Sequence, residues 1–168
     1  ISTQCESDFS NVQSTYTQCI SVDNFSENFD TAESAVMPNC WSKIITSVTS
    51  SNPTINVTSS YKNSAPYGVT FYGNGADMTN LDNKAILVSP SLLNVGEGTH
   101  RLRFQARLSS NGGTYDIQVV ALSSNTPDAE IEVIGTISHT ELTTTFKEFS
   151  VNFNDYTGSA AHVGIRRI

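Results

Sequence analysis

The amino-acid sequence predicts an all-β protein whose short antiparallel strands form a sandwich or a barrel. Two observations indicate this class. Segments in which apolar and polar residues alternate recur along the second half of the chain, separated by turn residues. No segment shows the spacing of an amphipathic helix. The chain has 168 residues, 38% of them hydrophobic, which fits one domain with a single core. We therefore expect very little helix.

The clearest strand is expected at residues 100–108, where apolar and polar side chains alternate with a period of two. Residues 114–122 repeat this alternation after a turn rich in Ser, Asn and Gly, so we expect the two strands to form a hairpin. In that hairpin Arg107 would lie near Asp116. Three further strands are expected, at residues 131–137, 147–153 and 161–168.

The first part of the chain is less regular. Residues 1–24 are polar and weakly patterned, which is typical of a linker or of an extension from a preceding module. We expect a single sandwich domain over residues 25–168, with a core that begins near Phe25. Residues 46–64, rich in Ser, Thr and Asn, indicate an exposed loop or an edge strand.

The charge balance excludes some classes of partner. The chain has 16 acidic and 9 basic residues, a net charge of -7, so DNA or RNA would be repelled. No apolar stretch is long enough to cross a membrane, and the sequence begins like a processed or excised piece. Few charges and many hydroxyl side chains are common in extracellular β proteins. We expect a secreted or cell-surface location, with no nucleic-acid partner and no membrane insertion.

Several short motifs occur in an order that resembles the cleaved-adhesin group, which is related to MAM domains and is often described as a choice-of-anchor domain of secreted Bacteroidetes proteins. The motifs are Glu27-Asn28-Phe29-Asp30, Met37-Pro38-Asn39-Cys40-Trp41, Ala85-Ile86-Leu87-Val88-Ser89-Pro90, Tyr156-Thr157-Gly158 and Val163-Gly164-Ile165-Arg166. The resemblance covers roughly residues 19–168. It implies a jelly-roll β-sandwich, a structural calcium ion, and attachment to glycans or to host and matrix proteins. The expected partners are a polysaccharide or glycoprotein ligand and neighbouring domains of the same chain.

If the resemblance extends to calcium, the ligands should be oxygens from both ends of the core, because the first and last strands of a jelly roll lie close together. The candidate ligands are Asp30 and Asp155, followed by Glu27 and Asn154. The loop at residues 72–77 would supply further oxygens. The alternative is that all of these are ordinary turn residues.

The cysteines, Cys5, Cys19 and Cys40, indicate one disulfide and one further thiol in an oxidising compartment. A Cys19–Cys40 bridge closes a loop of about twenty residues, worth roughly 3 kcal/mol in the chain-entropy model. It would tie the entry of the first strand to the segment that carries Trp41, which we interpret as a core residue. The alternative is a Cys5–Cys19 bridge that leaves Cys40 buried.

Two surfaces are candidates for glycan binding. The first holds aromatic rings that suit the apolar faces of sugars, although some of these rings are expected in the core; they are Tyr61, Tyr67, Phe71 and Tyr72. The second is the polar face of the predicted strand at residues 100–108, where arginines would hold a carboxylated or sulfated sugar or would only pair across the strands. These arginines are Arg101, Arg103 and Arg107.

No catalytic motif of a hydrolase, metalloprotease or phosphate-binding enzyme is present. If the protein were a small hydrolase, its candidate catalytic residues would be Glu130, Glu132 and His139. The alternative is that the two glutamates lie on the solvent-exposed face of a strand. The sequence therefore favours a non-catalytic carbohydrate-binding or adhesion module of a larger secreted protein. The main alternative is a structural spacer domain stabilised by calcium.

Overall fold

The structure is a computed structural model that describes residues 18–48, 52–73, 76–80 and 82–168. These residues form nine β-strands, two short 3₁₀ turns and no α-helix, which confirms the predicted all-β class. The strands are β1 (Ser42–Thr46), β2 (Thr54–Thr58), β3 (Gly68–Tyr72), β4 (Lys84–Val88), β5 (Arg101–Ala106), β6 (Ile117–Leu122), β7 (Ile131–Ile137), β8 (Lys147–Asn152) and β9 (His162–Arg167). The turns are η1 (Val95–Glu97) and η2 (His139–Glu141).

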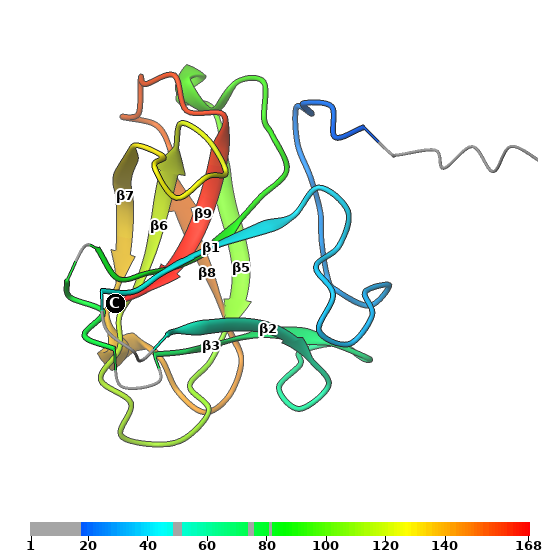
Figure 1. Ribbon diagram of the computed structural model, residues 1–168, viewed down its shortest axis with the longest axis vertical. Helices are drawn as coiled ribbons and strands as arrows, with labels where there is room; N and C mark the ends of the chain where they lie inside the picture. Colours follow the sequence, from blue (N-terminus) through cyan, green and yellow to red (C-terminus); the bar gives the residue numbers. More distant parts are fainter. Residues whose placement is uncertain (1–17, 49–51, 74–75, 81) are drawn as a thin grey trace, which may run out of the picture.

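One layer of the sandwich is a five-stranded antiparallel sheet with the order β1-β4-β9-β6-β7. The last strand of the chain, β9, lies at its centre (Figure 1). Gly164 of β9 is required there, because a Cβ atom at this position would lie 2.7 Å from methyl groups of both Ile86 and Leu122. These side chains belong to a buried cluster on the outer face of the sheet, so both faces of β9 are packed.

Two smaller antiparallel sheets, β5–β8 and β2–β3, form the opposite layer. The β5–β8 pair packs on β6 and β9 around Phe153, which is 1% exposed. The β2–β3 pair packs on β4 around Ile55, which is fully buried. Figure 1 shows that β2 and β3 cross beneath the sandwich at a steep angle to β5 and β9. The opposite layer is therefore divided, with β5 and β3 on either side of the division.

The predicted hairpin between residues 100–108 and 114–122 is wrong, although both strands exist. β5 pairs with β8, whereas β6 pairs with β7 and β9 in the other layer. The burial pattern gives the physical reason. Val119, Val120, Ala121 and Leu122 are all buried, as in a central strand covered on both faces, whereas β5 alternates between exposed and partly buried residues. Of the two alternatives predicted for residues 46–64, the edge strand is found at β2, which pairs only with β3 and places Ile55 in the core.

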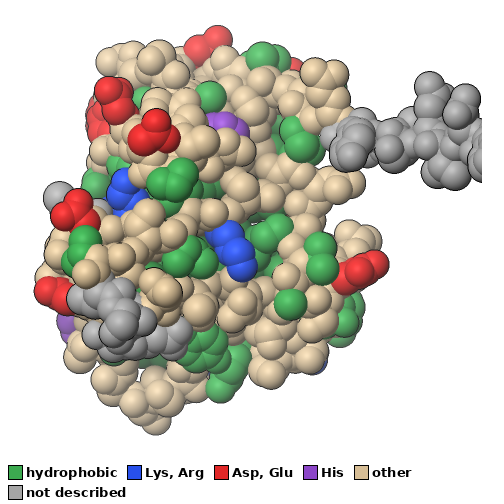
Figure 2. Space-filling view, in the orientation of Figure 1, with side chains coloured by type: hydrophobic (Ala, Val, Ile, Leu, Met, Phe, Trp, Pro, Cys, Tyr) green, Lys and Arg blue, Asp and Glu red, His purple; other side chains and the backbone are tan. Residues whose placement is uncertain are grey.

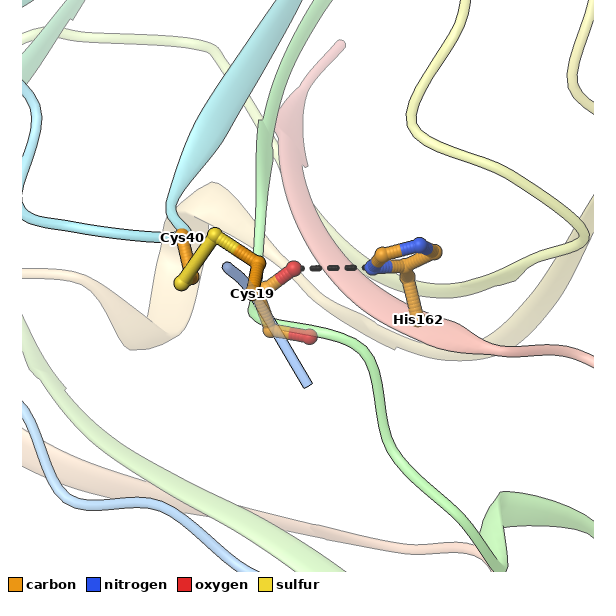
Figure 3. The surroundings of a disulfide bond; sticks show 4 residues. Cys19, Cys40 and His162 are labelled. Carbon is orange, nitrogen blue, oxygen red and sulfur yellow. Dashed lines mark hydrogen bonds between the residues drawn. A yellow bond between two sulfur atoms is a disulfide. The ribbon is translucent and has the colours of Figure 1, made fainter. Parts of the chain in front are cut away.

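Residues 18–41, called the strap here, run along one side of the sandwich without forming a regular strand (Figure 1). A disulfide joins Cys19 to Cys40, which confirms the predicted pairing; Cys5 lies outside the described residues. Figure 3 shows this disulfide near His162, whose Nδ1 atom makes a 2.9 Å hydrogen bond with the carbonyl oxygen of Ser89. The strap is thus fixed close to the point where β4 meets β9.

Further contacts hold the strap against the sandwich. Val22 forms an isolated parallel bridge with Leu92, so part of the predicted N-terminal extension lies against the sandwich. Three strap residues other than glycine have a left-handed backbone, at φ values of 63°, 64° and 66°. They are Phe29, Ala35 and Cys40. Such conformations cost roughly 1–2 kcal/mol each in residues with a Cβ atom, so the surrounding contacts must stabilise them.

No helix among the described residues is long and apolar enough to span a membrane.

Candidate functional site

A cleft of about 940 Å³ lies between the strap, β3 and β5. Side chains of the five-stranded sheet, among them Leu87 and Ile165, form its floor. Figure 2 shows hydrophobic side chains around a hollow between the sandwich and the segment at the right of the view. The cleft therefore lies where the opposite layer of the sandwich is divided.

The strand β5 borders the cleft with its unpaired edge. All of its residues line the cleft, whereas its partner β8 contributes only Glu148. The carbonyl group of His100 accepts a hydrogen bond from Phe153, in register with the β5–β8 ladder. Because the backbone groups of an antiparallel strand alternate in direction, those of Arg101, Arg103 and Gln105 point away from β8. Within the described part of the chain these backbone groups have no hydrogen-bond partner.

The two predicted binding surfaces meet in this one cleft. Every candidate residue predicted for sugar binding contributes to its lining, although the aromatic and arginine groups lie at least 29 positions apart in the chain. These residues are Tyr61, Tyr67, Tyr72, Arg101, Arg103 and Arg107. Tyr72 retains 42% of its surface. Phe71 also lines the cleft, and it packs against the core cluster beneath β3, as expected for some of these rings.

Arg107 lines the cleft next to the end of β5 and is only partly exposed, whereas the sequence suggested a side chain on an exposed strand face. Its guanidinium carbon lies 5.1 Å from the ring centre of Tyr61 and 5.3 Å from that of Phe146. Its Nη1 atom donates a 2.7 Å hydrogen bond to the carbonyl oxygen of Thr144. Cation–π contacts of this kind hold a guanidinium in place. Arg107 therefore connects the end of β5 to the loop after β2.

Another boundary of the cleft is formed by Arg167 and Tyr115, which sequence reasoning missed. The guanidinium carbon of Arg167 lies 3.3 Å from the ring centre of Tyr115. Burial lowers the pKa of Arg167, while the contact with Tyr115 opposes this shift. Tyr115 is 47% exposed. The sequence pattern does not predict this contact. Tyr115 belongs to a segment of alternating polar and apolar residues, which predicts only a strand, and Arg167 is a charged residue near the end of the sequence.

The wall opposite β5 is formed by the strap and is aromatic. Phe25 packs edge-on against Trp41 with ring centres 5.2 Å apart, and Phe29 lies 5.7 Å from the same ring. All three rings line the cleft. Trp41 is partly buried against the core cluster under β3, so it belongs to the core and the cleft wall at once. The sequence did not indicate Phe25 or Phe29 as site residues.

The predicted calcium ligands lie in two parts of the structure. In the strap, Glu27 accepts a 2.6 Å hydrogen bond from the backbone of Phe29, and Asp30 accepts one of 2.8 Å from Ser64. Asn154 and Asp155 follow β8, where the carbonyl group of Asn154 lies against Gly98, the residue that follows η1. Among the described residues, no three His, Cys, Asp or Glu side chains gather in a way that could hold a metal ion. The calcium site stays a prediction.

The predicted pairing of Arg107 with Asp116 is wrong, because these residues have different partners. The carboxylate of Asp116 accepts a 2.7 Å hydrogen bond from the backbone N–H of His139 and lies 2.8 Å from its Nδ1 atom. His139 is thus held at the start of η2. Neither it nor Glu130 or Glu132, the other residues that a hydrolase would use, lines the cleft.

The contacts between Asp116 and His139 determine how acidic pH affects the stability of the folded domain. The backbone N–H of His139, followed by its ring, lowers the pKa of Asp116 below the ordinary value near 3.9. The carboxylate therefore contributes stability that is complete above this ordinary value and is lost as the pH falls through the lowered one. In Asp116→Asn we expect a loss of about 1 kcal/mol or less at pH 7, since the pair is partly exposed.

The measurement is the urea midpoint between pH 2.5 and 6, where Asp116→Asn should show a shallower decline than the wild-type chain. Asp82→Asn is the matched control, because this exposed carboxylate accepts no hydrogen bond from any described residue. Parallel profiles for Asp116→Asn and the wild-type chain would contradict the prediction.

No protein-family model, no curated protein and no solved structure matches this chain.

Proposed function

We propose that this domain is a non-catalytic carbohydrate-binding or adhesion module and that its cleft is the glycan site. The observation that carries the proposal is the convergence of the aromatic loop and the arginine strand on one cleft. A volume of about 940 Å³ lies within the usual range of roughly 300–1,000 Å³ for ligand pockets.

The chemistry of the lining supports a sugar as ligand. Sugars present apolar C–H faces surrounded by hydroxyl groups, so they bind to aromatic rings beside amide and charged groups. Aromatic side chains of the strap, of β3 and of the loop before it surround the cleft. Amide side chains lie among them, at Asn24, Asn28, Asn63, Asn94 and Gln105. The unpaired backbone groups of β5 add both donors and acceptors for hydroxyl groups.

A secreted or cell-surface location fits the same proposal. A disulfide such as Cys19–Cys40 persists in oxidising compartments, which is where extracellular glycans occur. The resemblance to cleaved adhesins also supports attachment to a polysaccharide or to the glycans of a glycoprotein. Neighbouring domains of the same chain would then supply any catalytic or anchoring function.

The test is affinity electrophoresis in gels that contain neutral or acidic polysaccharides. We expect retardation of the wild-type domain in at least one gel, and a loss of roughly thirtyfold in affinity for Tyr67→Ala/Tyr72→Ala, because each ring contributes on the order of 1 kcal/mol to stacking.

Val133→Ala is the control. This side chain is 47% exposed on β7 and lies outside the lining of the cleft, so its removal should leave retardation unchanged. An absence of retardation in every gel would overturn the proposal, and so would an equal loss in the control variant.

A further inference from the structure

The arginines of this acidic chain are concentrated at the cleft. The sequence has nearly twice as many acidic as basic residues, yet every arginine contributes to the lining and no lysine does. The arginines are Arg101, Arg103, Arg107, Arg166 and Arg167. The carboxylates of the lining are Asp23, Glu27 and Glu148. The charge of the cleft is therefore opposite in sign to that of the whole chain.

One of these arginines directs its side chain elsewhere. Arg166 shares the outer face of β9 with Gly164, because alternate residues of a strand lie on one face. Its Nε atom donates a 2.8 Å hydrogen bond to Gln118, and it borders a second, smaller hollow on that face. The excess of positive charge in the cleft therefore comes from the other arginines.

Two further arginines are occupied by contacts within the protein. Arg107 lies against the rings of Tyr61 and Phe146, and Arg167 lies against the ring of Tyr115. These contacts fix their guanidinium groups at the boundaries of the cleft. They shape the site and contribute positive potential to it, but their planar faces are already covered.

Arg101 and Arg103 remain available to a ligand. Arg101 is exposed and forms no ion pair with any residue that the structure describes. Arg103 lies 3.9 Å from Glu148, but both side chains are more than half exposed, at 58% and 54%. An ion pair this exposed contributes little stability. The two arginines therefore have no strong partner within the domain.

The geometry of β5 places these two groups in a row. Arg101 and Arg103 lie two positions apart on one face of the strand, so their Cα atoms are separated by about 6.6–6.8 Å. The backbone N–H groups of the same residues point toward the cleft beside them. Guanidinium forks and backbone N–H groups together bind planar or tetrahedral anions through charge-assisted hydrogen bonds.

We infer that the ligand of the cleft is an anionic glycan, whose carboxylate or sulfate groups bind Arg101 and Arg103. The inference rests on the proposed carbohydrate-binding function and specifies the class of sugar. Arginines on an edge strand also deter pairing with other chains. That role needs only positive charge and no ligand, so replacement by lysine separates the two explanations.

The experiment compares three probes in affinity electrophoresis and calorimetry: polygalacturonate, its carboxyl-reduced neutral form, and poly-L-glutamate. We expect the wild-type domain to bind polygalacturonate at least tenfold more tightly than either comparison polymer. Arg101→Gln/Arg103→Gln should weaken this binding by roughly tenfold to a hundredfold, because charged hydrogen bonds are lost. Arg101→Lys/Arg103→Lys should also weaken it, since lysine cannot form the bidentate contact.

The matched control is Lys62→Gln/Lys147→Gln, which removes the same charge from exposed side chains outside the cleft lining. It should bind polygalacturonate as the wild-type domain does. Equal affinity for the neutral polymer would overturn the inference and leave the carbohydrate-binding function standing. Equal affinity for poly-L-glutamate, or full affinity in the lysine variant, would show that charge alone is recognised and would also overturn it. Binding to none of the polysaccharides would overturn both proposals.

Discussion

Removal of the Cys19–Cys40 disulfide is expected to destabilise the domain by roughly 3 kcal/mol and to abolish ligand binding. The stability loss follows from the loop of 21 residues that the bond closes, since a crosslink of this size reduces the entropy of the unfolded chain. The binding loss has a separate cause. The disulfide fixes both ends of the strap, and the strap carries Phe25 and Phe29 into the wall of the cleft.

The backbone of the strap makes this dependence stronger. Phe29, Ala35 and Cys40 have left-handed conformations that are unfavourable in a free segment. Once the disulfide is absent, the remaining anchors are the Val22–Leu92 bridge, a 3.0 Å hydrogen bond from the backbone N–H of Ala35 to the carbonyl oxygen of Val57, and side-chain contacts. We expect the strap to leave its position before the β-sandwich unfolds.

The measurement compares Cys19→Ser/Cys40→Ser with the wild-type pair, both in a Cys5→Ser background that prevents exchange with the third thiol. Urea unfolding gives the free energy, and retardation in a polysaccharide gel gives binding. Unchanged binding in the serine variant, with a sandwich that is still folded by circular dichroism, would contradict the role of the strap as a cleft wall.

Truncation of Phe153 to alanine is expected to cost about 3–5 kcal/mol, the usual range for a buried phenylalanine. Phe153 is 1% exposed and packs between the two layers, in contact with Val119, Val163 and Tyr156. Its backbone N–H also donates to the carbonyl group of His100, where β8 ends beside β5. The side chain thus joins the β5–β8 pair to the five-stranded sheet.

Phe153→Leu is the companion variant, since it keeps most of the apolar volume and should cost less than about 1.5 kcal/mol. Chemical denaturation of both variants provides the comparison. A loss below about 1 kcal/mol for Phe153→Ala would mean that the two layers do not share one core.

The sequence predicted the positions of the strands far better than the pairing between them. The alternation of Leu102 and Phe104 with arginines predicted β5, because a half-buried strand leaves this pattern wherever it lies. The partner of β5 was not predictable, since alternation is the same for a hairpin and for a crossover between layers. The two arrangements differ in the burial of β6. Val120 and Leu122 are buried on its second face, as in a central strand covered on both sides, whereas a hairpin of two half-buried strands would leave them exposed.

For the candidate site, too, the sequence predicted the suitable residues but not their arrangement in space. Aromatic and arginine residues were recognisable as suitable for sugar binding, because this depends on side-chain chemistry. Their assembly into one cleft depends on how β3 and β5 sit across the five-stranded sheet, which local patterns do not encode. Arg107 illustrates the difference, since it reads as an exposed strand residue and instead lies between Tyr61 and Phe146.

The bridge between Val22 and Leu92 joins residues seventy positions apart. This separation affects the stage of folding at which the cleft forms. Contacts between distant parts of a chain form slowly, because a long loop must close before they add stability. The strap precedes β1 in the sequence, but Val22 can pair with Leu92 only after the segment that contains β1 to β4 has been synthesised. A chain shortened to begin at Phe25 would lose both Val22 and Cys19. Its sandwich would retain every strand, whereas the cleft would lack the anchors of one wall.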